Sequence, residues 1–136
     1  MPQTAVAYIA TALALVLLDA VYLTQVGGPL FRTTVGDMAA DKVALAPAVG
    51  FYLIYSFAVM ALCVSPALGA GSWTRAAAAG AVLGLAAYGA YDLTNMATLK
   101  SWSLTLTLVD MAWGAGATAV SSAAGVFAAR ALVRAV

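Results

Sequence analysis

The sequence predicts an all-α integral membrane protein, a bundle of four transmembrane helices. Of the 136 residues, 65% are hydrophobic and only 8% are charged, whereas soluble domains carry roughly 25% charged residues. The mean hydropathy is +1.00. The hydrophobic residues also fall into stretches long enough to cross a hydrocarbon core, which takes about 20 residues in a helix.

The predicted spans cover approximately residues 5–26, 45–64, 76–98 and 103–130 of a single transmembrane domain. We expect the first span to end at Gly27-Gly28-Pro29 and the second at Ser65-Pro66, because glycine and proline commonly interrupt helices. Between the first two spans, the segment from Gly27 to Lys42 has hydrophobic residues at near-helical spacing. It is predicted to be either a short interfacial helix or a surface loop.

The composition excludes several kinds of chemistry. The chain has no histidine and one cysteine, so His-ligated haem and Ser–His or Cys–His nucleophile pairs cannot be built from this chain alone. The net charge of +1 gives no electrostatic basis for binding nucleic acid. We therefore predict no cofactor, no metal site and no nucleic-acid partner. A removable signal peptide is disfavoured, because no basic residue precedes the first span and Asp19 lies inside it.

Rows of small residues at four-residue intervals occur in the last two spans: Ala76, Gly80 and Gly84, and then Ala117, Ser121 and Gly125. Such rows let the backbones of membrane helices approach closely. Packing within one bundle is favoured over a dimer interface. A homo-oligomer is expected if the chain transports its ligand, because four helices enclose a narrow pore at best.

Three of the five acidic residues fall inside predicted spans: Asp19, Asp92 and Asp110. A charged side chain at the centre of a bilayer costs roughly 2.5–3.5 kcal/mol on insertion scales, so such residues are rarely accidental. Asp19 and Asp92 lie seven or eight residues before the far ends of their spans, and Asp110 follows Trp102 by eight residues. From the helical rise, all three are predicted to lie ~10–12 Å below the same face of the membrane.

Hydrogen-bonding side chains accompany this aspartate layer at helical spacing. Each aspartate is followed after three residues by an aromatic or amide side chain, and two tyrosines precede Asp92. Tyr55 in the second span is expected to approach from the side. The predicted pocket residues are Asp19, Tyr22, Tyr88, Tyr91, Asp92, Asn95, Lys100, Asp110 and Trp113.

Two interpretations of the aspartate layer are open. One is a polar pocket that opens towards the face bearing Lys100, and the other is an interhelical hydrogen-bond clamp with a purely structural role. Three carboxylates in a low-dielectric layer cannot all be ionised without compensation. We expect Lys100 to reach down on its apolar stem, and at least one aspartate to be protonated or matched by a bound cation.

Three strings in the chain carry a family resemblance: Leu18–Leu23 (LDAVYL), Tyr91–Trp102 (YDLTNMATLKSW) and Val109–Gly114 (VDMAWG). They resemble the small bacterial membrane proteins described as domain of unknown function 2177, and the similarity extends over essentially the whole chain. The resemblance implies a multi-pass protein of the bacterial inner membrane with four helices. It implies no particular activity.

The basic residues divide evenly between the two predicted sides of the membrane: Arg75, Arg130 and Arg134 on the side of the N-terminus, and Arg32, Lys42 and Lys100 on the other. Because two arginines lie close to the end of the last span, we expect both termini to be cytoplasmic. The lipid bilayer is the one partner that the composition itself requires.

Three functions fit these observations. The first is binding or transport of a small ion, a polar molecule or a lipid-like ligand in the aspartate-lined pocket. The second is an enzyme embedded in the membrane that acts on a lipid or isoprenoid, because paired aspartates in an apolar site can serve as general acid and base. The third is a structural or assembly subunit. Binding or transport ranks first, and the ligand itself is not predicted.

Overall fold

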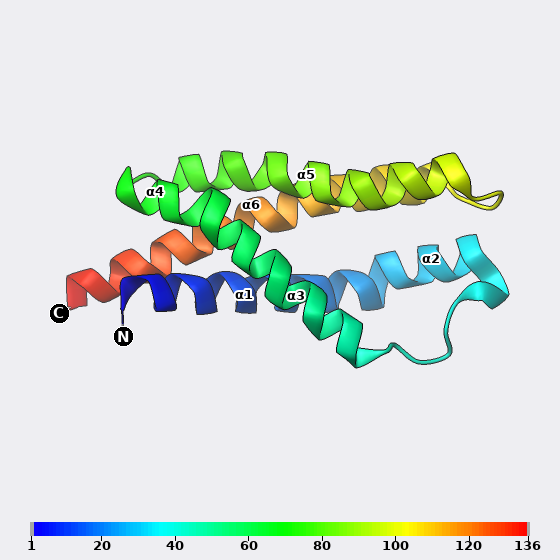
Figure 1. Cartoon of the computed structure of the whole chain (residues 1–136), viewed down its shortest axis with the longest axis horizontal. Helices are drawn as coiled ribbons and strands as arrows, with labels where there is room; N and C mark the ends of the chain where they lie inside the picture. The colour runs from blue at the N-terminus through cyan, green and yellow to red at the C-terminus, as the bar shows by residue number, and fades with distance from the viewer. Residues whose placement is uncertain (1, 136) are drawn as a thin grey trace.

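Helices account for most of residues 2–135, the part of the chain that the computed structural model describes, and no strand occurs there. Four continuous helices are long and apolar enough to cross a membrane: Gln3–Met38, Leu45–Gly69, Trp73–Thr98 and Leu104–Arg134. Figure 1 shows them running lengthwise together, with both termini at the same end. The predicted fold class, a bundle of four membrane helices, is confirmed. The limits of the membrane spans within these helices stay a prediction.

The first long helix continues through the point where we expected it to end. α1 (Gln3–Tyr22) leads through a π-helical turn (Leu23–Gly27) into α2 (Gly28–Val35), and a 3₁₀ turn (Gly36–Met38) follows. In the π turn, the Gly28 N–H bonds to the Leu23 carbonyl, and a Cβ on Gly28 would overlap that carbonyl oxygen. The expectation that Gly27-Gly28-Pro29 stops the helix is therefore wrong, and most of the segment up to Lys42 extends α1.

The second long helix passes its proline in the same way. α3 (Leu45–Val59) continues through a π turn (Met60–Val64) into α4 (Ser65–Gly69). The Ser65 N–H bonds to the Met60 carbonyl, and Pro66 follows directly. Proline lacks an N–H and its ring clashes with the carbonyl four residues earlier, and a π turn placed just before it relieves both problems. Ser65-Pro66 does not end this helix, contrary to expectation.

The last two long helices are uninterrupted. α5 spans Trp73–Thr98 and α6 spans Leu104–Ala135. Each begins after a serine whose hydroxyl accepts a hydrogen bond from a backbone N–H of the first turn. Ser72 accepts from Arg75 at 3.2 Å, and Ser103 accepts from Leu106 at 3.1 Å. Such caps satisfy N–H groups that the helix itself leaves unpaired.

α5 and α6 pack closely at small residues, through Gly80 and Gly84 on α5. A Cβ on Gly84 would overlap the carbonyl oxygen of Gly114, and a Cβ on Gly114 would overlap the ring of Tyr88. One turn earlier on α5, a Cβ on Gly80 would meet Thr118 and Ser122. The two backbones therefore approach at Gly84 and Gly114 within this one chain, as the row on α5 predicts. The row predicted on α6 does not form this contact, because a Cβ on its Gly125 would instead overlap Thr11 of α1.

The hydrophobic core lies in the half of the bundle that carries the termini. It is formed by Ala7, Leu15, Tyr55, Val59, Met60, Cys63, Val64, Ala67, Ala76, Val126 and Ala129. α3 packs against α1, and its N-terminal part leans away from α5 at the opposite end (Figure 1). We call the half with this core the closed half, and the half between the start of α3 and the α5–α6 connection the open half.

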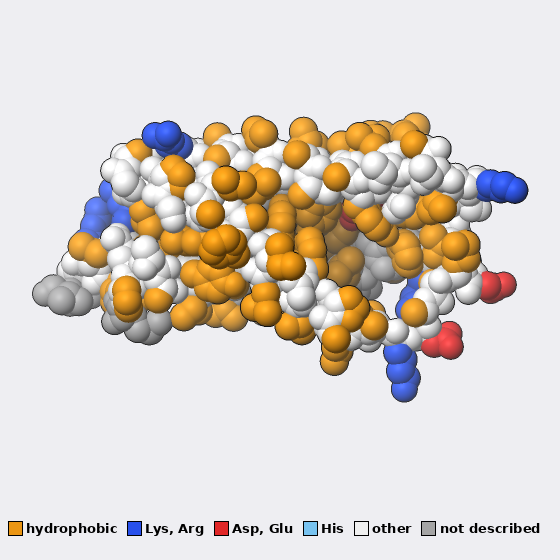
Figure 2. Space-filling model, in the orientation of Figure 1, with side chains coloured by type: hydrophobic (Ala, Val, Ile, Leu, Met, Phe, Trp, Pro, Cys, Tyr) orange, Lys and Arg blue, Asp and Glu red, His pale blue; other side chains and the backbone are white. Residues whose placement is uncertain are grey.

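The surface of the bundle suits a membrane. Figure 2 shows charged side chains at the two ends of the molecule and hydrophobic side chains along most of the length between them. Large hydrophobic residues are exposed on several helices, including Leu17, Ile54, Val82 and Val120, each at least 57% exposed. In lipid, these side chains face acyl chains rather than water.

Candidate functional site

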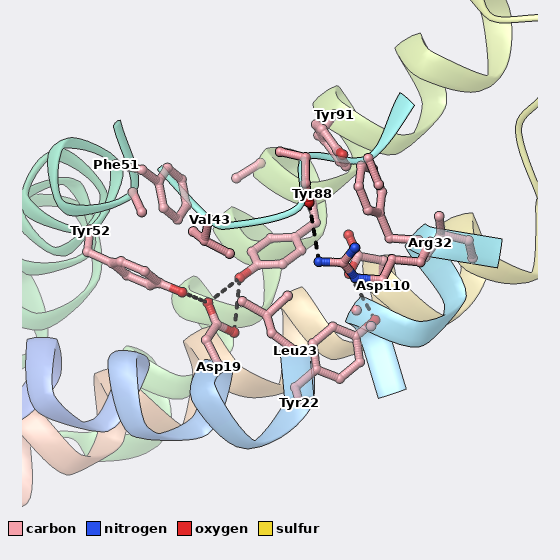
Figure 3. Close-up of a pocket in the computed structure, with 18 residues that line it drawn as sticks. Asp19, Tyr22, Leu23, Arg32, Val43, Phe51, Tyr52, Tyr88, Tyr91 and Asp110 are labelled. Atoms are coloured by element: carbon pink, nitrogen blue, oxygen red, sulfur yellow. Dashed lines mark hydrogen bonds between the residues drawn. The ribbon is translucent and has the colours of Figure 1, made fainter. Parts of the chain in front are cut away.

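A cavity of about 600 Å³ occupies the open half, between α1, α2, α3, α5 and α6. Small-molecule sites in proteins have volumes of roughly 300–1,000 Å³. Figure 2 shows this face hollowed between α3 and α2, and Figure 3 shows the side chains that converge there. Most of the wall is apolar, and the polar side chains that line it are Asp19, Tyr22, Arg32, Tyr52, Tyr88, Tyr91 and Asp110.

Asp19 on α1 accepts hydrogen bonds from all three of the other long helices. The Tyr52 hydroxyl of α3 donates to its Oδ2 at 2.9 Å, and the Trp113 Nε1–H of α6 donates to its Oδ1 at 2.7 Å. The Tyr88 hydroxyl of α5 reaches Oδ2 at 3.2 Å. The side chain is 4% exposed, so these donors satisfy the carboxylate without water. Asp19 thus ties the four long helices together at the base of the cavity.

Asp110 on α6 is half-buried and faces the cavity. The Tyr22 hydroxyl donates to its Oδ1 at 2.9 Å. The Tyr22 ring also stacks on Trp113, with ring centroids 4.6 Å apart and planes 7° apart. This stack joins the surroundings of Asp110 to those of Asp19.

The aromatic side chains of α1 and α6 each donate a hydrogen bond to the aspartate of the other helix. Tyr22 follows Asp19 by three residues and donates to Asp110, whereas Trp113 follows Asp110 by three residues and donates to Asp19. Side chains three residues apart project from the same face of a helix, so both members of each pair point towards the neighbouring helix. The spacing within each helix selected these four residues. Each aromatic residue, however, pairs with the aspartate of the other helix and not with the aspartate three residues before it.

Asp92 on α5 lies behind the cavity wall rather than in it. It is 0% exposed, and neither of its carboxyl oxygens has a hydrogen-bond donor among residues 2–135. The carboxyl of Asp110 lies against it. The three aspartates therefore differ: Asp19 has three donors, Asp110 has one and Asp92 has none within the described chain.

The remaining predicted residues lie around this group. Tyr91 lines the cavity and meets Trp102 edge-on, with ring centroids 5.7 Å apart. Asn95 is half-buried one turn beyond Asp92 and lies outside the lining. Lys100 is exposed in the connection between α5 and α6, and it too lies outside the lining. The basic side chain that lines the cavity is Arg32.

Arg32 and Tyr52 were not among the residues predicted from the sequence. Arg32 enters the cavity because the first helix continues past Pro29, and its Nη2–H donates to the Ala40 carbonyl at 3.3 Å (Figure 3). Tyr52 lies seven residues into α3, the same depth count that selected Asp19. That count would have favoured Tyr52 over Tyr55, which instead pairs with Thr118 Oγ1 at 2.8 Å in the closed half.

The family model described as predicted membrane protein (DUF2177) matches residues 4–127 of the chain. The chain belongs to this family. The matched region contains every residue of the cavity lining and the three buried or half-buried aspartates, so the DUF2177 match and the predicted resemblance agree. Neither a curated protein nor a solved structure matches the chain. Together with the four apolar helices, the family match identifies a multi-pass membrane protein.

Proposed function

We propose that this protein binds an amphiphilic, lipid-derived molecule in the cavity of its open half. The observation that carries the proposal is the combination of apolar walls with carboxylates at the base of one cavity between membrane helices. A molecule with an acyl or isoprenoid chain matches the walls, and its polar head matches the base. Binding rather than catalysis or scaffolding is thus the first candidate.

The polar groups of the cavity indicate what the head carries. Asp110 accepts one hydrogen bond from Tyr22 and keeps acceptor capacity towards the cavity. A hydroxyl or amino group of the ligand would donate to it. Aromatic rings of Phe31, Phe51 and Tyr88 line the same space, and such rings favour a cationic or flat apolar group.

The closed half argues for binding over passage through the bundle. Buried side chains such as Leu15, Val59 and Val126, each 1% exposed or less, fill the interior between the cavity and the termini. The proposal includes a homo-oligomer only if the ligand is transported, because four helices with a filled interior leave no continuous path.

Native mass spectrometry of the purified protein tests the proposal, with two substitutions on one helix. Ala48 lines the cavity, whereas Val49 is 54% exposed to lipid. We expect Ala48→Phe to reduce the co-purified lipid several-fold by filling the cavity, and Val49→Phe to retain the wild-type amount. Equal retention by both variants would contradict binding in this cavity.

Acid–base catalysis on the bound lipid is the second candidate. The contact between Asp110, which faces the cavity, and the buried Asp92 favours it, because paired carboxyls can act as general acid and base. Extraction of an added lipid after incubation, followed by chromatography and tandem mass spectrometry, separates the two candidates. Binding alone leaves the lipid chemically unchanged, whereas catalysis yields a product of different mass or, for a rearrangement, of different retention and fragmentation.

The proposal includes a location in the bacterial inner membrane with both termini cytoplasmic. It is supported by the basic residues near the end of the last helix and by the position of both termini at one end of the bundle (Figure 1). Reporter fusions at the C-terminus and in the loop between Met38 and Leu45 should report opposite compartments. Reports from the same compartment would contradict this topology.

A further inference from the structure

The contact between α5 and α6 includes a pair of aspartates. Along the interface, close approaches join Gly80 to Ser122, Gly84 to Thr118 and Tyr88 to Gly114. Each step advances four residues on α5 and goes back four residues on α6, as expected for antiparallel helices. The next step in this series joins Asp92 to Asp110, and the two carboxyls are indeed in contact.

The surroundings of this pair supply too few donors for two carboxylates. Tyr22 of α1 donates to Asp110, and no donor reaches Asp92 from residues 2–135. The other titratable groups near the pair are Tyr91 on α5 and, further along α1, Asp19. Arg32 of α2 lines the adjoining cavity and donates to the Ala40 carbonyl.

Two ionised carboxylates in contact repel one another, and an isolated charge without donors is costly in a dry interior. One proton placed between the two carboxyls removes both problems. It gives Asp92 a hydrogen-bond partner and leaves the pair with a single negative charge. Carboxyl pairs that share one proton are a known solution to this situation.

We infer that Asp92 and Asp110 form a proton-binding site in which the two carboxyl groups share one proton. Asp92 is the sealed member, at 0% exposure, and Asp110 is the member that faces the cavity. The proton therefore enters and leaves through Asp110 and the cavity. This site lies beside the proposed lipid site and does not depend on a bound lipid.

Carbon-13 NMR of aspartate carboxyls tests the inference directly. The chain has five acidic residues, all aspartates, so protein labelled at the aspartate carboxyl carbon in detergent micelles gives five resonances. The resonances of Asp37 and Asp41, both exposed, serve as references. At neutral pH we expect the resonances of Asp92 and Asp110 to lie away from the chemical shift of an ionised carboxylate, the ionised position, and to move together when the shared proton is lost. Five resonances at the ionised position would overturn the inference.

Two variants sharpen the result. Asp92→Asn removes one carboxyl and offers an amide donor to Asp110, so the Asp110 resonance should move to the ionised position at neutral pH. The exposed variant Asp37→Asn should leave Asp92 and Asp110 unchanged. An Asp110 resonance that does not move in Asp92→Asn would contradict proton sharing. If Asp92→Asn fails to fold, the titration of the wild-type protein still decides the question.

The measurement uses no lipid ligand, so it separates the proton site from the proposed function. Loss of lipid binding in Ala48→Phe with an intact proton signal would support both. Ordinary carboxyl titration combined with lipid binding would refute the proton site alone. A functional assay adds a further contrast. We expect Asp92→Asn to lose more of its ability to rescue the phenotype of a gene deletion than of its folding stability.

Discussion

The closed and open halves use the same four helices and solve different packing problems. In the closed half, small residues let backbones meet, as at Gly80, and the interior holds apolar side chains together with buried hydroxyls such as those of Thr118 and Ser122. In the open half, the start of α3 leans away from α5 (Figure 1), and long aromatic side chains cross the resulting space to reach carboxylates. Asp19 is accommodated where α3 diverges from α5, because donors from the other helices need room to reach it.

The open half also contains a graded set of aspartates. Asp19 is satisfied by donors from three helices and holds the bundle together. Asp110 has one donor and faces the cavity, and Asp92 has none among the described residues. The clamp and pocket interpretations of the aspartate layer therefore apply to different residues: the clamp describes Asp19, and the pocket is proposed around Asp110.

The largest expected effect on stability comes from removing the clamp. Asp19→Ala leaves the half-buried donors of Tyr52, Tyr88 and Trp113 without their acceptor, and each unsatisfied group costs about 1–3 kcal/mol when buried. We expect the variant to lose about 3 kcal/mol or more of its free energy of unfolding, measured by denaturation in detergent. Asp37→Ala, at an exposed carboxylate, should change it by less than about 0.5 kcal/mol. Similar losses of stability in both variants would contradict the assignment of Asp19 as the residue that ties the helices together.

A smaller effect is expected where the close packing meets the open half. A Cβ on Gly114 would overlap the Tyr88 ring, whereas a Cβ on Gly116 has open space around it. Gly114→Ala should therefore destabilise the protein by about 1–3 kcal/mol through overpacking. Gly116→Ala should be neutral or stabilising by up to about 1 kcal/mol through helix propensity. Thermal unfolding of the two variants side by side checks this difference, and equal midpoints would argue against the observed α5–α6 register.

The smallest effect concerns single hydroxyl groups. Tyr88→Phe removes one of the three donors to Asp19 and should cost about 1 kcal/mol. Tyr91 is 49% exposed, so Tyr91→Phe should leave the free energy of unfolding nearly unchanged. Urea or dodecyl sulfate titration of both variants gives the comparison. If Tyr91→Phe proved the more damaging, the hydrogen-bond network assigned to Asp19 would be incorrect.

Much of the fold could be predicted because membrane helices are specified by length and hydropathy, which are local properties. The two helix ends assigned at prolines were wrong for a local reason as well. A single π turn before Pro29 or Pro66 lets the helix continue, and no hydrophobic period reveals such a turn.

The site could be predicted in part, because the three aspartates within spans and their neighbours at helical spacing stood out. The exchange of partners between Tyr22 and Trp113 depends on how α1 and α6 face each other, which spacing within one helix cannot reveal. Arg32 was missed because its position depends on the continuation of the helix through Pro29. Errors in helix ends thus became errors in the site.

The most direct test of an occupied open half is an NMR comparison of two buried leucines in lipid nanodiscs. Leu106 is 3% exposed and lines the cavity, whereas Leu15 is 1% exposed and belongs to the core of the closed half. If a lipid occupies the cavity, nuclear Overhauser effects should connect acyl-chain protons to the Leu106 methyl groups and should be absent at Leu15. If neither leucine shows a nuclear Overhauser effect to acyl-chain protons, the proposal that a lipid occupies the cavity is contradicted.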